Sequence, residues 1–106
     1  MTINEKVNCL SKVLDHNFCK LKAIEECIEI SEVLVKSMTK SLENQPTTDK
    51  IIEELADCIL RLNIISDQLN INTEVISQIN TKIDLLYKNH VLTENNSKEL
   101  IIKNTK

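Results

Sequence analysis

Apolar residues recur every three or four positions through most of the chain, which is the spacing of one face of an α-helix. Polar stretches interrupt this spacing at three places, and the longest surrounds the single proline. Residues with side-chain oxygens stand where two of the helices would begin, as N-caps do. The pattern predicts four helices, over about residues 3–15, 17–42, 49–69 and 73–89, with Thr2 or Asn4 capping the first and Thr48 or Asp49 capping the third.

The second predicted helix carries more apolar surface than one small bundle needs to bury. A second apolar face widens the main apolar stripe beyond half of the circumference, and one small bundle does not need to bury both. We therefore expect a homo-oligomer, a dimer or a tetramer, whose bundle is completed across subunits. The main stripe consists of Leu21, Ile24, Ile28, Val35, Met38 and Leu42, and the second face of Ala23, Cys27, Ile30, Val33 and Leu34.

Composition narrows the fold class. The 106 residues include no glycine, one proline and two aromatic residues, so the chain is poor in turn formers and strand formers. Average glycine usage of about 7% would give about seven glycines in a chain of this length. We predict an all-α, four-helix bundle-like fold with one domain over residues 1–92, followed by a polar tail or short extra helix over 93–106.

Charge and hydropathy exclude several classes of protein. The net charge of −3 argues against a nucleic-acid binder, which would present a basic face, and against attraction to an anionic membrane. No apolar run approaches the roughly 20 residues of a membrane-spanning helix, and the first residues lack the pattern of a signal peptide. We expect a cytoplasmic protein whose four cysteines are reduced and fill helical interfaces.

Two pairs of acidic residues are the strongest chemical signal. Glu26 and Glu29 stand three positions apart in the second predicted helix, and Glu54 and Asp57 do so in the third. Residues at this spacing share one helix face, so four carboxylates converge if the two helices pack side by side. Oxygen ligands of this kind are preferred by Mg²⁺, with Mn²⁺ as the alternative.

A solvated face is the alternative interpretation of each pair. In a chain with 27% charged residues, acids three apart often mark a wet surface balanced by basic neighbours. Lys22 could pair with Glu26, and Arg61 with Asp57. The apolar residues that border both acid pairs favour the cation site, because burying charge without a partner is costly.

The acidic motifs, in this order, resemble those of the MazG-like nucleoside triphosphate pyrophosphohydrolases, the all-α NTP pyrophosphatase family. Glu25-Glu26-Cys27-Ile28-Glu29 is similar to the family's Glu-Glu-x-x-Glu motif, and Glu54-Leu55-Ala56-Asp57 to its Glu-x-x-Asp motif. The similarity covers roughly residues 18–88. It implies Mg²⁺-dependent hydrolysis of a nucleoside triphosphate to the monophosphate and pyrophosphate.

The resemblance also implies roles for individual residues. Glu26, Glu29, Glu54 and Asp57 would be the metal ligands, while Glu25, or less favourably Glu53, would orient or deprotonate the attacking water. For the substrate, the resemblance favours Lys82 and then Lys88 as phosphate ligands, and Phe18 could line a base pocket. One departure is Leu85, which stands about where relatives often carry an arginine. The rival hypothesis is therefore a catalytically idle helical-bundle protein that binds a partner or senses nucleotides.

Overall fold

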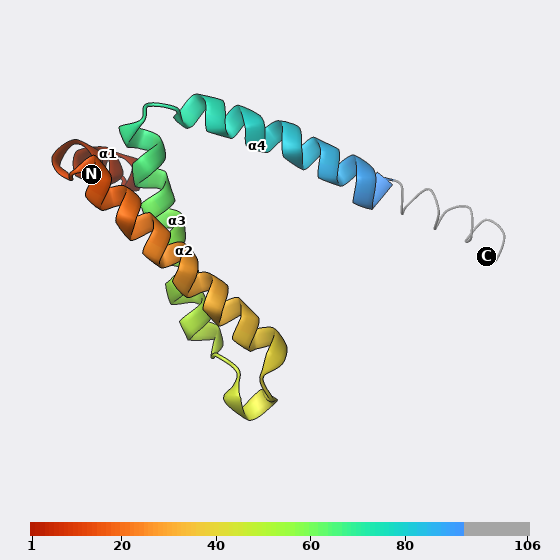
Figure 1. The fold of residues 1–106 in the computed structure, drawn as a ribbon. Coiled ribbons are helices and arrows are strands. Elements are labelled where there is room, and N and C mark those ends of the chain that lie inside the picture. Colours follow the sequence, from red (N-terminus) through yellow and green to blue (C-terminus); the bar gives the residue numbers. More distant parts are fainter. Residues whose placement is uncertain (93–106) are drawn as a thin grey trace. The chain divides into compact units, whose positions relative to one another are not determined.

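The computed structural model describes residues 1–92, and every regular element in that range is helical (Figure 1). The all-α prediction is confirmed, with four α-helices present. They are α1 (Ile3–Val13), α2 (His16–Thr39), α3 (Thr48–Gln68) and α4 (Asn72–Leu86), with a 3-10 turn, η1 (Leu42–Asn44), and a π-helical segment, η2 (Tyr87–Leu92). None of these helices combines the length and apolar character that crossing a bilayer requires.

Contacts divide the chain into two compact units, Met1–Ile71 and a second unit that begins at Asn72. The first unit contains α1, α2 and α3, and the described part of the second contains α4 and η2. One domain over residues 1–92 stays a prediction. The tail or extra helix predicted over 93–106 lies outside the described residues.

Three side-chain caps fix where the helices of the first unit begin. The Thr2 hydroxyl accepts a hydrogen bond from the Glu5 backbone N–H at 3.1 Å, as predicted. Asp15 caps α2 through the backbone N–H of Phe18 at 2.9 Å. The prediction that Thr48 or Asp49 caps α3 was wrong, because the extended backbone of Thr47 lets its hydroxyl accept from Lys50 N–H at 3.1 Å. Such caps satisfy N–H groups that the first helical turn leaves unpaired.

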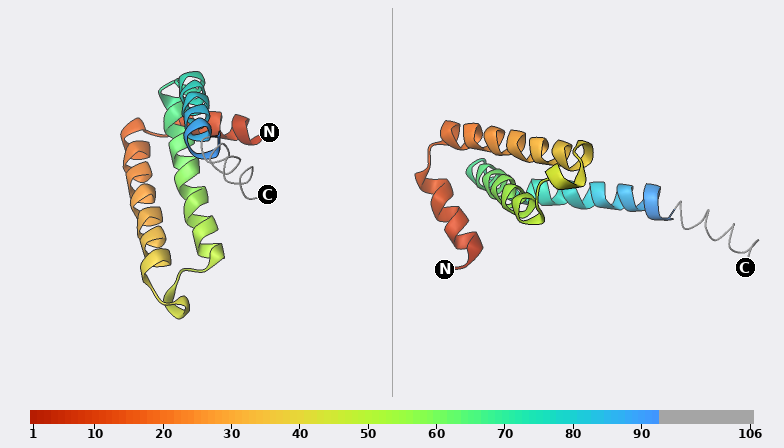
Figure 2. Two further views of the ribbon diagram at one scale, coloured as in Figure 1. Left: turned by 90° about the vertical axis from the view of Figure 1, so that its right-hand side faces the viewer. Right: turned by 90° about the horizontal axis from the view of Figure 1, so that it is seen from below.

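The antiparallel pair of α2 and α3 is the centre of the first unit, and the two helices run side by side in Figures 1 and 2. The face that α2 turns toward α3 contains Ala23, Ile30 and Val33, all buried. The six residues of the main stripe, Leu21, Ile24, Ile28, Val35, Met38 and Leu42, are all more than half exposed in the single chain. The helix has two apolar faces, and α3 packs against the second one.

Helix α1 packs on α3 near the end of that helix. The side-chain amide of Gln68 donates to the backbone carbonyls of Ser11 at 3.1 Å and Leu14 at 3.0 Å, which ties the end of α1 to α3. The same nitrogen lies 3.4 Å from the sulfur of Cys19, which is completely buried. Among the described residues, Ile64, at 1% exposed, and Cys19 are the largest side chains that are fully buried.

Asn70 ends α3 in the left-handed region, with φ of 56°. Its N–H donates to the carbonyl of Asp67 at 3.0 Å, and the N–H of Ile71 donates to that of Ser66 at 3.1 Å. These two bonds form the Schellman arrangement that usually places glycine at this position. In a chain without glycine, asparagine takes the position because it tolerates this conformation at low cost.

Helix α4 of the second unit is amphipathic, and none of its residues is buried. Its apolar side chains at the predicted 3-4 spacing are between 37% and 59% exposed. They are Val75, Ile76, Ile79, Ile83 and Leu86.

Candidate metal centre

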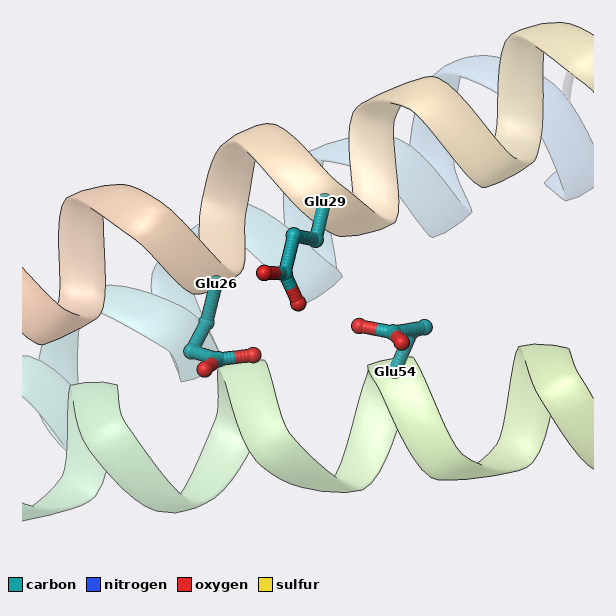
Figure 3. A group of neighbouring side chains, drawn as sticks. All are labelled: Glu26, Glu29 and Glu54. Carbon is teal, nitrogen blue, oxygen red and sulfur yellow. The ribbon is translucent and has the colours of Figure 1, made fainter.

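Three acidic residues meet between α2 and α3. Glu26 and Glu29 project from one turn of α2 toward α3, and Glu54 projects from α3 toward α2 (Figure 3). One carboxylate oxygen from each residue lies within 4.8 Å of those of the other two. We call these three residues the acid cluster. The structure therefore brings together three of the four acids that the sequence nominated as metal ligands.

Burial differs sharply within the acid cluster. Glu54 is 4% exposed, Glu26 is half-buried and Glu29 is exposed. Among the described residues, one oxygen of Glu54 and one of Glu26, Oε2 in each, is buried without a hydrogen-bond partner. Buried carboxylate oxygens normally have partners, because removing such an atom from water is costly. Two unpartnered oxygens on facing helices need a cation or a proton.

Lys50 compensates part of this charge. Lys50 stands one helical turn before Glu54 on α3, and its Nζ lies 2.8 Å from Glu54 Oε1. The pair lowers the pKa of Glu54, chiefly through this hydrogen bond, and outweighs the burial that acts in the opposite direction. Glu54 is therefore held ionised, and its other oxygen is the buried, unpartnered one. Our sequence reasoning missed Lys50, although its position four residues before Glu54 was a usable signal.

Glu29 responds to its neighbours in the opposite way. The adjacent Glu54 carboxylate, which can accept a hydrogen bond from a protonated Glu29, raises the pKa of Glu29 above its ordinary value. The negative charge of Glu26 raises this pKa further. Without a bound cation, the carboxylates of the acid cluster repel one another, and this repulsion favours the protonated form of Glu29. Like charges that share one small volume behave in this way.

Asp57 belongs to a second group. Its carboxylate lies with those of Glu53 and Glu54 within the same 4.8 Å limit, along the surface of α3. Glu54 is common to both groups, so the two candidate positions for a cation adjoin each other. Within residues 1–92, these two groups are the sets of three or more metal-ligating side chains that lie this close.

The two candidate base residues occupy different surroundings. The carboxylate of Glu25 pairs with Lys22 Nζ at 3.1 Å and contributes to neither acidic group. The sequence also allowed Lys22 to pair with Glu26, and the ion pair that forms is with Glu25. Glu53 is exposed and adjoins Glu54 and Asp57. Of the two, Glu53 is the one that shares a group with Glu54 and Asp57, and the role of either residue as the base stays a prediction.

The candidate substrate residues lie in both units. Phe18 is 43% exposed in the first turn of α2, and Lys22 Nζ lies 5.8 Å from the centroid of its ring, a cation–π contact. Lys82 is exposed on α4, and Lys88 is exposed in η2. Their roles with a substrate stay predictions.

An apolar groove of about 870 Å³ runs along the first unit between α2 and α3. Its walls include Ile24, Ile28 and Val35 from the exposed stripe of α2, with Leu62 and Ile65 from α3. No member of the acid cluster lines it. The groove and the acid cluster are therefore separate features of the same helix pair.

No protein-family model, curated protein or solved structure matches the chain.

Proposed function

We propose that the acid cluster of Glu26, Glu29 and Glu54 holds a divalent cation, Mg²⁺ or Mn²⁺. The observation that carries this proposal is the pair of buried, unpartnered oxygens on Glu26 and Glu54. Their donor set fits such an ion, because Mg²⁺ and Mn²⁺ favour carboxylate oxygens. The group of Glu53, Glu54 and Asp57 supplies further carboxylates beside it.

We further propose that the protein hydrolyses a nucleoside triphosphate to the monophosphate and pyrophosphate. The likeness of the two acidic motifs to the MazG-like family supports this proposal. A bound divalent cation supplies charge neutralisation for the phosphates and lowers the pKa of a bound water. A nucleotide substrate is also consistent with the cytoplasmic location expected from the sequence.

The protein's own residues have distinct parts in this reaction. Water attacks the α-phosphorus, and the bond from that phosphorus to the bridging oxygen breaks, so that pyrophosphate leaves. Glu53, exposed beside Glu54 and Asp57, is the better placed carboxylate to accept the proton of the water, with Glu25 as the alternative. Lys50 keeps Glu54 ionised. Lys82, Lys88 and Phe18 are the proposed contacts to the phosphates and the base.

Product analysis tests the reaction directly. The full chain is incubated with a panel of ribo- and deoxynucleoside triphosphates, with Mg²⁺ and with EDTA. The proposal predicts equal amounts of monophosphate and pyrophosphate from one or a few nucleotides, with none in EDTA. Release of inorganic phosphate and a diphosphate would instead identify a different hydrolase.

A catalytically idle interaction or nucleotide-sensing protein is the second candidate. The exposed apolar groove and Leu85, which is 57% exposed at the position where an arginine was expected, favour it. A thermal shift assay with Mg²⁺ and a non-hydrolysable triphosphate separates the cases. A ligand at 100 times its Kd stabilises a protein by about 2.7 kcal/mol. A shift without turnover identifies the sensor, and no shift with any nucleotide identifies the interaction protein.

We propose that the chain forms a homo-oligomer through its exposed apolar stripe. Ile24, Ile28 and Val35 are each more than half exposed and line the groove. Contiguous apolar surface of this kind marks an interaction site. Ile28→Asp should reduce the mass measured by light scattering, whereas Glu43→Gln, a change at an exposed residue outside the groove, should not. A monomeric wild-type chain across the concentration range would contradict the proposal.

A further inference from the structure

Two cysteine sulfurs meet between α2 and α3. Cys27 Sγ and Cys58 Sγ lie 3.5 Å apart, although the residues are 31 positions apart in the sequence. Both are free thiols. At this separation one thiol donates a hydrogen bond to the other sulfur, and a shift of about 1.5 Å would bring the sulfurs to the 2.05 Å of a disulfide.

The other two cysteines have different surroundings. Cys9 is exposed on α1, and Cys19 is completely buried, with its sulfur 3.4 Å from the Gln68 side chain. Cys27 and Cys58 are therefore distinguished from both by having a second thiol within reach. Cys9 and Cys19 serve as internal controls for any oxidation experiment.

In the free subunit, the apolar groove gives access to Cys27. Cys27 is half-buried and lines the groove, whereas Cys58 is buried and does not line it. A small oxidant that enters the groove meets the sulfur of Cys27 first. The sulfenic acid formed on Cys27 lies beside the sulfur of Cys58, 3.5 Å away in the reduced protein, which favours a second reaction between the two residues over further oxidation of Cys27.

We propose that Cys27 and Cys58 form a reversible redox modification site, in which an oxidant such as hydrogen peroxide joins α2 covalently to α3. The Cys27 thiolate attacks one peroxide oxygen and breaks the O–O bond, which yields a sulfenic acid and hydroxide. The Cys58 sulfur then attacks the sulfenic sulfur, and the departing hydroxide takes the thiol proton to leave as water. In sum, two thiols lose two electrons and two protons, and the peroxide becomes two waters. A dithiol reductant reverses the reaction by exchange.

A bond between these cysteines would also affect the acid cluster, because both cysteines stand close to its residues in the sequence. Cys27 directly follows Glu26 on α2, and Cys58 stands one helical turn after Glu54 on α3. Closing the two sulfurs draws together the turns that carry these acids. A displacement near 1 Å in a catalytic site can reduce the rate about 100-fold. This consequence, unlike the bond itself, rests on the proposed function, and we expect the oxidised protein to turn over its substrate at least about 10-fold more slowly than the reduced protein.

The bond is tested by mass spectrometry on the full chain. Reduced protein is titrated with hydrogen peroxide, then analysed without reductant as the intact protein and as peptides. We expect a loss of two hydrogen atoms per chain, a crosslinked peptide joining Cys27 to Cys58, and recovery of both thiols with dithiothreitol. Cys9→Ser should behave as the wild type, and Cys27→Ser should give no intramolecular crosslink. Stable oxygen adducts on Cys27, or crosslinks that involve Cys9 or Cys19 in place of this pair, would overturn the proposal.

A second readout does not depend on mass spectrometry or on catalysis. The crosslink restricts the unfolded chain, so the Tm of the oxidised wild type should rise by at least about 5 °C. The Tm of Cys27→Ser should not rise after the same treatment. Turnover, if present, is then compared for oxidised and reduced protein. Absence of turnover in both forms would count against the proposed function and leave the mapped bond standing, whereas equal turnover would overturn its effect on the acid cluster.

Discussion

Lys50 and Glu54 form an ion pair along one side of α3, with Nζ and Oε1 separated by 2.8 Å. The two residues are unequally accessible, because the Lys50 side chain is 50% exposed and that of Glu54 is 6% exposed. The half-exposed lysine therefore places its positive charge beside a carboxylate that is almost inaccessible to water. Its ammonium group pairs with one oxygen of Glu54, and the other oxygen is buried without a hydrogen-bond partner. This division explains how a chain can keep a buried carboxylate ionised in the absence of a metal.

Replacing Lys50 with methionine should destabilise the metal-free protein. Glu54 would keep its burial and lose its counter-charge, and breaking a buried ion pair from one side is strongly destabilising. Because the lysine is half exposed, we expect a moderate fall in Tm, by roughly 5 °C. Mg²⁺ should restore more stability to Lys50→Met than to the wild type. A Tm equal to that of the wild type in EDTA would show that Glu54 does not depend on this pair.

Removing one ligand should remove the response to the cation. In the wild type, Mg²⁺ at 100 times its Kd should stabilise the fold by about 2.7 kcal/mol. Glu26→Gln keeps the size of the side chain and removes its charge, so the Mg²⁺-dependent rise in Tm should be lost. Glu43→Gln, a control in η1 outside both acidic groups, should retain the full rise. An equal rise in all three proteins would indicate binding elsewhere.

The pKa of Glu29 predicts an unusual dependence of stability on pH. A raised pKa means that the folded protein holds this proton more tightly than the unfolded chain does. The contribution of this proton to the free energy of unfolding is fully present below pH 4.5, the ordinary pKa of the group. It is lost as pH rises through the raised pKa of the folded state. Glu29→Gln lacks this loss, so in EDTA its free energy of unfolding should increasingly exceed that of the wild type as pH rises above 4.5.

Glu54 changes the dependence of stability on pH in the opposite direction. Its lowered pKa provides stability above the ordinary value, and this stability is lost as pH falls through the pKa of the folded state. The hydrogen bond from Lys50, the largest cause of the lowered pKa of Glu54, is common to Glu29→Gln and the wild type, whereas the smaller contribution of Glu29 to that pKa is lost in the variant. Urea unfolding at several pH values measures the difference. A difference that stays constant across the pH range would contradict a raised pKa for Glu29.

Core packing predicts a contrast between two isoleucines on α3. Ile64 is 1% exposed, and Ile64→Ala should reduce the free energy of unfolding by about 2–5 kcal/mol. Ile59 is 55% exposed, and Ile59→Ala should cost well under half as much. Urea denaturation of both variants at low protein concentration measures the two costs. Equal losses would show that Ile59 is covered in solution, as an interface between subunits would cover it.

Sequence patterns predicted the helices better than their packing. The 3-4 spacing of apolar residues and the polar breaks located all four α-helices, because both signals are local. The helix α2 offers two apolar faces, and local periodicity does not say which one meets α3. Ile28 of the main stripe is 53% exposed, whereas Ile30 of the second face is buried.

In the candidate site, too, some features could be predicted from the sequence and others could not. Acids three positions apart had to share a helix face, so the approach of Glu26 and Glu29 to Glu54 required only that α2 and α3 pack side by side. The role of Lys50 depended on one side-chain rotamer and was missed, and the approach of Cys27 to Cys58 depended on the register of two helices. Features set by helix register or rotamer follow from tertiary packing and were not accessible from spacing alone.

The most direct test of the central claim compares hydrolysis by the wild type, Glu54→Gln and Glu43→Gln. Each protein is given the same panel of nucleoside triphosphates with Mg²⁺, and monophosphate and pyrophosphate are measured, with circular dichroism to confirm equal helicity. Our account predicts metal-dependent release by the wild type and by Glu43→Gln, and a loss of at least about 100-fold in Glu54→Gln. Undiminished release by Glu54→Gln, or no release by well-folded wild type, would contradict it.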